Sequence, residues 1–531
     1  MGGGLMQLVS YGAQDIYISG NPQITFWKIL YKRHTNFAVE SIEVTFNGQA
    51  DFNKRVVAVI NRNADLMYKT YVQVVLPQID LTSGSSGTFN TTSTQQGFRW
   101  LNYIGHRLLK QVEVEIGGQR IDRQYGDWMQ IWTQLSTEAG NVAALDSLVG
   151  NTHDLVLLKR GSGIALDATC SSSETTISCV PRRGTPAKTL YIPLQFWFCR
   201  NPGLAIPLIA LQYHEVRINV DFETWQNCQY YEVAPGSPTS AAAQSLAAAS
   251  LYVDYVYLDT EERRRFAQQS HEYLIEQVQF TGAESITSSS NKIQLNFNHP
   301  VKELQWVVQR DSFVDCSNPT WIASVGGPQP FNYSDDFSTE GLIMSLLSQA
   351  STTGAANAGA LNQGVISGNS AATAILGGGA TNLASIVGAD TYDLSASGEF
   401  ESGVNYLLAK VILDSGVRCE GKKPVEVAKI QLNGQDRFTE REGSYFDRVQ
   451  PFQHHSRTPS TGINVYSFAL RPEEHQPSGT CNFSRIDKAT LQLTVSLNTV
   501  TGARTAQVRV YALNYNVLRV MSGMGGLAYS N

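Results

Sequence analysis

A glycine-containing stretch near residue 420 has the spacing of a phosphate-binding loop. Gly416 and Gly421 are followed by Lys422, where such a loop places the lysine that contacts phosphate. The next residue is Lys423, although a hydroxyl is needed there to bind magnesium. Pro424 stands where a helix should begin and donate its N–H groups to phosphate. The stretch therefore predicts a turn between strands and no nucleotide site.

Histidine patterns also fail to form a metal or catalytic site. His214 and His271 each precede a glutamate, but neither has the second histidine that a zinc-protease helix requires. The pair His454-His455 lacks a cysteine or carboxylate at ligand spacing, which favours a solvated loop over a metal site. No serine-hydrolase or dinucleotide-binding motif is present. We therefore predict no catalytic, metal-binding or cofactor-binding residues, and no enzyme activity.

Composition limits the partners. The 531 residues carry a net charge of −6, and only 16% of them are charged. Direct binding to nucleic acid needs a Lys/Arg excess and is not expected. A polar surface with few charges suits packing against many protein neighbours, because few charges must be desolvated. The seven cysteines form no CxxC pair, which favours reduced thiols, although Cys170 and Cys179 are near enough to pair in a loop. No signal peptide or membrane-spanning run is expected.

The elements that would position any site are predicted to be strands. Apolar and polar residues alternate strictly in many short runs, which indicates strands with one buried face. Turn residues separate the runs, as in a sandwich or jelly roll. The clearest runs are 42–46, 112–116, 216–222, 293–297 and 491–497.

An internal repeat indicates two copies of one β domain. The segment from Val114 to Arg120 is echoed from Ile430 to Arg437, each as a strand, a tight turn at Gly118 or Gly434, and a polar restart. The motifs at 196–202 and 468–472 are also alike, and each precedes one of the alternating runs, at 216–222 and 491–497.

Few helices are expected. One starts at Trp128, with Asp127 as its cap and Gly140 at its end. Another starts at Asp259, with Glu262 completing a capping box. Long loops are predicted at 80–97, 159–189 and 333–400.

Four segments resemble the major capsid proteins of the nucleo-cytoplasmic large DNA viruses. They are Leu8–Phe26, Tyr31–Ala38, Tyr252–Phe266 and Tyr466–Ile486, in the order found in that family. The resemblance implies an all-β chain of two consecutive eight-stranded jelly rolls, with long surface loops and a few short helices. The expected division is an inner-face segment 1–25, a first jelly roll 26–225, a linker 226–250, a second jelly roll 251–520 with the insertion 333–400, and a tail 521–531.

The resemblance also implies a structural role in a virus shell. Three chains would form a pseudo-hexagonal capsomer, and many capsomers would tile an icosahedral capsid. The partners would be the chain itself, neighbouring capsomers, minor capsid and penton proteins, and proteins of an internal viral membrane. The chain would be located in the virion and assembled in the cytoplasm of an infected host cell. An alternative from the β pattern alone is a carbohydrate-binding surface protein, and a second is a cupin-type enzyme.

The segment between Pro472 and Pro477 is the candidate structural loop. Both prolines stop strand pairing, and the charged residues make contacts either within this chain or between chains. They are Arg471, Glu473, Glu474 and His475. Three sequons, at Asn90, Asn332 and Asn482, would accept glycans if the chain meets glycosylation machinery.

Overall fold

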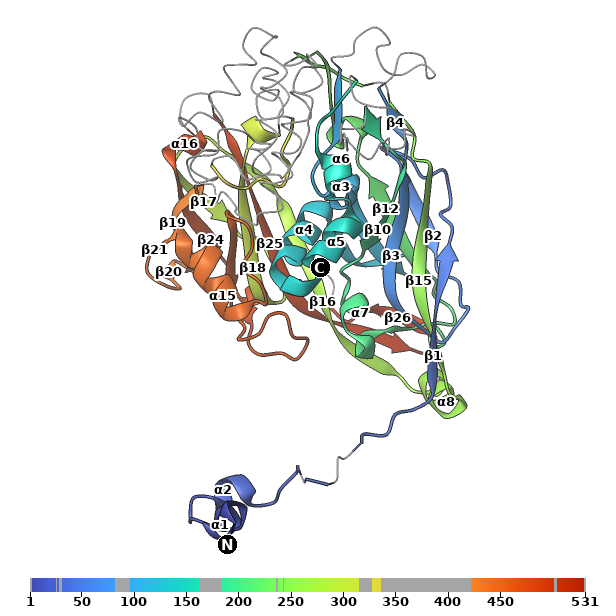
Figure 1. Cartoon of the computed structure of the whole chain (residues 1–531), viewed down its shortest axis with the longest axis vertical. Coiled ribbons are helices and arrows are strands. Elements are labelled where there is room, and N and C mark those ends of the chain that lie inside the picture. The colour runs from blue at the N-terminus through green and yellow to red at the C-terminus, as the bar shows by residue number, and fades with distance from the viewer. Residues whose placement is uncertain are drawn as a thin grey trace.

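A computed structural model describes most of the chain and shows an all-β architecture with few helices (Figure 1). Its described residues are 2–24, 26–27, 31–81, 96–161, 183–234, 237–241, 243–314, 327–335, 422–500 and 504–529. The predicted turn at 416–421 and nearly all of the insertion 333–400 lie outside them. Within these ranges, no helix has the length and apolar character needed to cross a bilayer.

The first sandwich consists of two antiparallel sheets whose main rows have four strands each. One row is β1 (Phe37–Val44), β15 (Ala248–Leu258), β3 (Leu66–Leu76) and β10 (Lys188–Pro193), with β11 (Ile206–Pro207) beside β3. The other row is β2 (Arg55–Val59), β12 (Val216–Phe222), β6 (Leu109–Ile116) and β7 (Gln119–Tyr125).

The second sandwich repeats this arrangement. One row is β16 (His271–Ile286), β25 (Ala506–Met521), β18 (Pro300–Arg310) and β22 (Ile463–Ser467), with β23 (Cys481–Asn482) beside β18 and β26 (Met524–Leu527) beside β25. The other row is β17 (Ser290–Gln294), β24 (Ala489–Val495), β19 (Val425–Leu432) and β20 (Gln435–Asp436), with β21 (Arg441–Glu442) beside β19. Position by position, each strand has a counterpart in the first sandwich, so the two eight-stranded jelly rolls are confirmed.

The glycine repeat marks the same hairpin in both sandwiches. Ile116 pairs with Gln119 in the first, and Leu432 pairs with Gln435 in the second, so each loop has two residues. Both loop residues have positive φ in each case: Gly117 and Gly118 (60° and 82°), Asn433 and Gly434 (51° and 81°). Positive φ at both positions defines the type I′ turn that matches the twist of the flanking strands.

The boundary between the sandwiches differs from the expected one. Residues 226–250 were expected as a linker, but β13 (Gln229–Ala234) pairs with β5 (Gly97–Trp100), and β15 pairs with β1 and β3 of the first sandwich. The Pro- and Ala-rich composition suggested a linker, yet its apolar residues pack in the first core. The chain leaves that sandwich only after Leu258, through α8 (Thr260–Gln268), which Asp259 caps as expected by accepting from Thr260 N.

Smaller elements extend the first sandwich beyond its eight strands. β5 also pairs with β8 (Lys159–Arg160), β13 with β14 (Ser237–Pro238), and β4 (Ile79–Asp80) with β9 (Gly184–Thr185). The short helices include α3 (Ile104–Leu108), α5 (Val142–Val149), α6 (His153–Val156), α7 (Trp197–Arg200) and α16 (Leu497–Val500). The expected helix at Trp128 is α4 (Gly126–Ser136), which ends before Gly140. In the second sandwich, a π-helical turn (Tyr445–Val449) leads into α15 (Gln450–His454).

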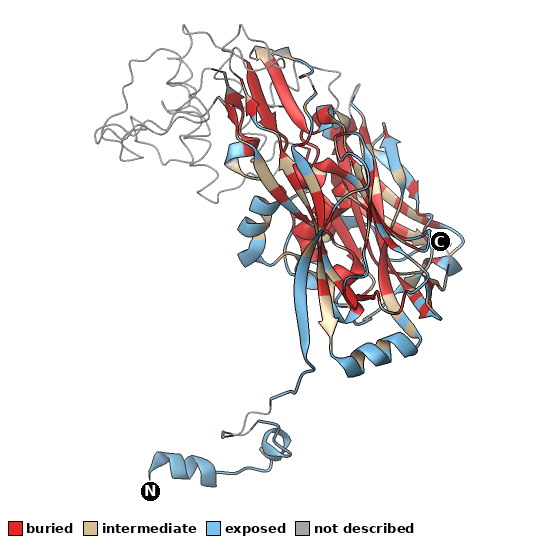
Figure 2. Ribbon diagram, turned by 90° about the vertical axis from the view of Figure 1, so that its right-hand side faces the viewer, coloured by how far each residue is buried: buried red, intermediate tan, exposed pale blue. Residues whose placement is uncertain are grey.

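The N-terminal part projects away from the body. It contains α1 (Gly3–Val9) and α2 (Ile16–Ser19), and no residue of either helix is buried (Figure 2). We call the described residues before β1 the arm. Its large apolar side chains lie at the surface, among them Leu8, Tyr17, Ile18, Ile24, Phe26 and Trp27.

Candidate assembly site at the junction of the two sandwiches

The two sandwiches share a buried junction built around α4. This helix follows β7, and its residues Trp128, Ile131, Trp132 and Leu135 lie in one hydrophobic cluster with residues of the second sandwich. Figure 1 places α4 between the two sandwiches. We call the covered face of the β16-β25-β18-β22 sheet the junction face. Its apolar members include Ile275, Val307, Ile463, Val465, Tyr511 and Leu513.

Hydrogen bonds and one ion pair fix the position of α4 on the junction face. Arg509 Nη1 lies 2.6 Å from Asp127 Oδ2. Gln134 Oε1 accepts from Ser460 Oγ at 2.7 Å, and Leu135 O accepts from Arg457 N at 3.1 Å. Directional contacts of this kind set one relative orientation of the two sandwiches, whereas apolar contacts alone would tolerate sliding.

A cluster of buried charges crosses the same junction. Glu276 on β16 lies 2.9 Å from Arg200 Nη2 of the first sandwich and 2.6 Å from Lys302 Nζ on β18. The Lys302 side chain is fully buried and that of Glu276 is 5% exposed. Burial alone would raise the pKa of Glu276, but the two cations outweigh it and hold the pKa at about 2. The carboxylate is therefore charged, and its ion pair with Arg200 holds the first sandwich against the second.

A second charged group surrounds the buried His455. Its Nε2 lies 3.0 Å from Glu303 Oε2, and its Nδ1 lies 2.9 Å from Glu473 Oε1. Burial lowers the pKa of His455, but the two carboxylates raise it further, to about 9. The imidazolium is thus the stable form at neutral pH. Its ring also makes an edge contact with Trp132 of α4, which connects it to the first sandwich.

The structure divides the four residues of the candidate loop into two pairs. Glu473 and His475 turn inward: Glu473 binds His455 and Ser456, and His475 Nδ1 lies 3.8 Å from Glu276 Oε1. Arg471 and Glu474 turn outward and form a 3.0 Å ion pair, with side chains 72% and 55% exposed. The inner pair contacts its own chain, while the outer pair is available to a neighbour.

The other residues singled out from the sequence include two histidines and three sequon asparagines. His214 Nδ1 lies 3.0 Å from Gly525 O, and His454 Nδ1 lies 3.0 Å from Leu470 O. Asn332 is buried, and its amide donates to Gln329 Oε1, so the folded chain hides this sequon. Asn482 is exposed and accepts from Ser484 N, whereas Asn90 lies outside the described residues.

Two further features of the described part of the chain concern metal ligands and thiols. No group of three His, Cys, Asp or Glu side chains could hold an ion there. Cys199 and Cys228 are buried free thiols, and burial raises the pKa of Cys199 to about 11. Cys170 and Cys179 lie outside the described ranges.

Sequence reasoning missed Arg200, Glu276 and Lys302. One signal was available, because Lys302 and Glu303 stand between the apolar residues Val301 and Leu304 in the sequence of β18. Charged residues in such a strand are buried only when they are paired. The partners lie far apart in sequence, and only the fold brings them together.

Comparison with known families covers nearly the whole chain. A model described as "Major capsid protein N-terminus" matches residues 25–259, and one described as "Large eukaryotic DNA virus major capsid protein" matches residues 262–526. The two matches meet at α8, where the structure passes from one sandwich to the other. The chain belongs to the major capsid protein family of large eukaryotic DNA viruses.

Relatives in this family are similar over their full lengths. The major capsid protein of Phaeocystis pouchetii virus is 56% identical and that of Chrysochromulina ericina virus 51% identical, each with 100% of both chains covered. A chain of the PBCV-1 virus capsid superposes with a TM-score of 0.62 at 33% identity, covering 96% of this chain and 100% of that one. The chain is therefore a structural protein of the virion capsid, with the double jelly-roll fold of this family.

Proposed function

We propose that three copies of this chain close into a pseudo-hexagonal capsomer and that many capsomers tile an icosahedral shell. The observation that carries the proposal is the matching strand order of the two sandwiches. Two similar sandwiches per chain give a trimer six nearly equivalent corners, which suit a hexagonal lattice. Closed threefold symmetry needs a heterologous interface, in which two different surfaces of each chain meet.

The first of these surfaces is the counterpart of the junction face. In the β1-β15-β3-β10 sheet, Tyr71 stacks on Tyr252 at 5.3 Å and contacts Tyr191 at 5.9 Å. We call these three residues the tyrosine face. Tyr191 is 39% exposed, and the other two are half-buried. In contrast, Val307, Tyr511 and Leu513 of the junction face are at most 1% exposed. Within the chain, one of two equivalent sheet faces is covered and the other is open.

The second surface is the counterpart of α4. In the first sandwich α4 follows the β6-β7 hairpin, and in the second α15 follows β19-β20 and the short β21. α4 covers the junction face, whereas Phe452 of α15 is 81% exposed and the nearby Leu470 is 74% exposed. Figure 1 places α15 at the left of the molecule, while β1, β3 and β15 lie to its right. Surfaces on opposite sides allow a ring to close.

These surfaces support one interface, repeated three times. α15 of one copy covers the tyrosine face of the next, as α4 covers the junction face within a copy. Exposed aromatic residues on both surfaces match the composition of stable interfaces, which are enriched in tyrosine and phenylalanine. The exposed ion pair of Arg471 and Glu474 lies in the segment after Leu470 and belongs to the polar rim.

The arm is the reason for proposing partners on the inside of the shell. Its exposed apolar side chains need a cover in the virion, and it leaves the first sandwich at the end where β1 begins. We place this end toward the interior, next to minor capsid and penton proteins and the proteins of an internal viral membrane. We place capsid assembly in the cytoplasm of the infected host cell, without direct contact between this chain and nucleic acid.

Light scattering of the purified chain tests the proposal. We expect a stable particle of about three times 58.3 kDa. The variant Phe452→Glu should reduce this mass toward one chain, because it places a charge in an apolar interface. The control Gln268→Ala changes an exposed residue of α8 and should leave the trimer intact. A wild-type chain that stays monomeric at high concentration would contradict the capsomer.

A further inference from the structure

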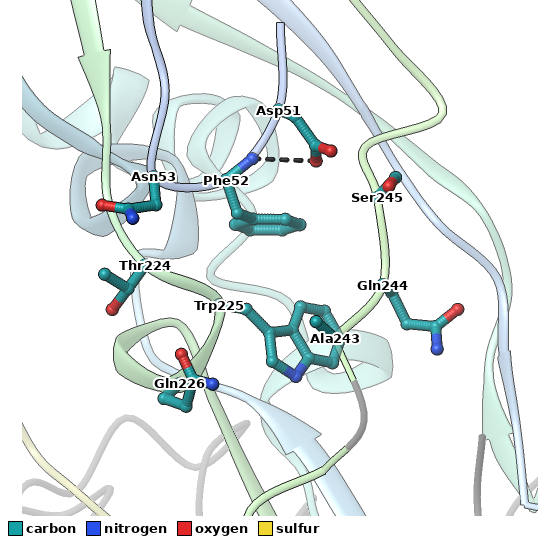
Figure 3. Close-up of a pocket in the computed structure, with 9 residues that line it drawn as sticks. All are labelled: Asp51, Phe52, Asn53, Thr224, Trp225, Gln226, Ala243, Gln244 and Ser245. Carbon is teal, nitrogen blue, oxygen red and sulfur yellow. Dashed lines mark hydrogen bonds between the residues drawn. The ribbon is translucent and has the colours of Figure 1, made fainter.

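A small polar pocket lies at one end of the first sandwich. It has a volume of about 210 Å³ and is formed by three connections: the one between β1 and β2, the one after β12, and the one before β15 (Figure 3). β15 runs from Ala248 beside the pocket to Leu258, which pairs with Phe37 where the arm begins. Eleven extended residues span about 35 Å, so the pocket and the arm lie at opposite ends of the sandwich.

The floor of the pocket is aromatic. Phe52 and Trp225 meet edge to face at 5.3 Å, and Phe98 and Trp100 pack beside them in the core. The Trp225 ring is 2% exposed, and its indole N–H is buried without an acceptor in the described part of the chain. The floor is therefore apolar, because the one polar atom of the Trp225 side chain is closed to solvent.

The rim of the pocket consists of amides, hydroxyls and one carboxylate. Asn53, Gln226 and Gln244 contribute amides, and Thr224 and Ser245 contribute hydroxyls. Asp51 uses Oδ1 to accept from Phe52 N and Leu246 N, at 2.8 and 3.1 Å, so the carboxylate is held in place. No lysine or arginine lines the pocket.

These features select the ligand class. An anion is disfavoured, because the charged lining residue is a carboxylate and the nearby Lys54 already pairs with it, with Nζ 3.9 Å from Asp51 Oδ2. An apolar ligand would displace water from the polar rim and offer no hydrogen bond in return. The volume is below the roughly 300–1,000 Å³ of sites for drug-sized molecules, so the ligand is about one ring in size. A neutral sugar fits, since its hydroxyls both donate and accept and its C–H groups pack against aromatic rings.

We propose that this pocket binds one neutral hexose unit of a glycan. The site goes beyond the capsid role and does not depend on it. If the first sandwich faces outward at this end, the pocket is on the outer surface of the shell. Two sources supply such a sugar. They are the surface of a susceptible cell and the glycans of neighbouring shell proteins.

Saturation-transfer NMR of the full chain with methyl glucoside, galactoside and mannoside tests the site. We expect transfer to at least one of them, and loss of it in Ala243→Trp, which fills the pocket from an exposed position. Asp51→Asn should weaken binding by about tenfold by removing a charge-assisted hydrogen bond. Gln268→Ala, at the arm end, is the control and should bind normally.

Absence of transfer to all three sugars would overturn the proposal, as would full binding by Ala243→Trp. An unchanged particle mass in that variant shows that the capsomer is intact, which separates failure of the pocket from failure of the capsid role. Immobilised polysaccharide from susceptible cells and glycopeptides from the shell then identify the source. Retention on either one, abolished by Ala243→Trp, supports the site, and retention on neither overturns a glycan ligand.

Discussion

The two sandwiches have the same strand order but differ in what covers their equivalent sheets. In the second sandwich, the β16-β25-β18-β22 sheet is buried on both faces, by its own core and by α4 of the first sandwich. In the first sandwich, the corresponding β1-β15-β3-β10 sheet has an open tyrosine face. In the proposed capsomer, the contact made once within the chain, by α4 on the junction face, is therefore repeated between chains, by α15 on the tyrosine face.

Breaking the junction cluster should have the largest effect. Glu276→Gln leaves Lys302 and Arg200 without their carboxylate inside the protein. We expect a loss of about 3–5 kcal/mol in the free energy of unfolding, measured with urea. The matched control is Glu474→Gln, which removes an exposed ion pair of the same chain and should cause no measurable change. Equal effects of the two variants would refute a special role for the junction.

Truncating a side chain should destabilise the folded chain when it lies on the junction face, and the trimer when it lies on the tyrosine face. Leu513→Ala on the junction face should reduce the free energy of unfolding by about 2–5 kcal/mol, because it leaves a buried cavity. Tyr71→Ala on the tyrosine face should cost the isolated chain about 1 kcal/mol or less. The same change should weaken the trimer by about 2 kcal/mol, measured by mass photometry on dilution. A trimer as tight as the wild type would place the interface elsewhere.

The stability of the second sandwich should depend on pH through His455. The pKa of His455 is raised to about 9 in the folded chain. Its contribution to the free energy of unfolding is therefore fully present below about pH 6.5 and is lost as the pH rises through 9. His455→Gln should remove this part of the decline in stability between pH 6.5 and 9. Urea unfolding at pH 6, 7.5 and 9 measures it, and identical slopes for the variant and the wild type would argue against a buried imidazolium.

The smallest effect should be equal in the two sandwiches. Gly118 and Gly434 occupy the same turn position with φ of 82° and 81°. Apart from the adjoining residues, no atom in the described part of the chain lies within 4 Å of an added Cβ at either. Alanine at each position should therefore cost only the backbone strain, about 1 kcal/mol. Thermal unfolding of both variants checks this, and a large inequality would show that the hairpins are not equivalent.

Much of the fold could be predicted from the sequence, since period-two alternation reports a strand with one wet face. The runs at 112–116 and 216–222 are of this kind, and they lie in β6 and β12. The run at 491–497 was extended too far, because β24 ends at Val495 and Leu497 begins α16. Alternation does not say which sheet a strand joins, and for this reason β15 was assigned to the wrong sandwich.

The site was less accessible to sequence reasoning. The sequence singles out the loop at 471–475 as a candidate, but its division into an inward and an outward pair depends on His455 and Glu276, which are distant in sequence. The partnership of Arg200 with Glu276 leaves no local pattern. Likewise, α15 is a short helix, and nothing in its sequence marks it as a contact surface. Only its position in the second sandwich, which corresponds to that of α4 in the first, indicates one.

In the proposed capsomer, α15 of one copy covers the tyrosine face of another. A photo-reactive benzoylphenylalanine in place of Phe452 tests it directly, because the residue is exposed and the replacement is also aromatic. After illumination of the trimer, we expect cross-linked dimers whose peptides join position 452 to β3, β10 or β15 of a second chain. Cross-links confined to one chain, or to other strands of the partner, would contradict the claim.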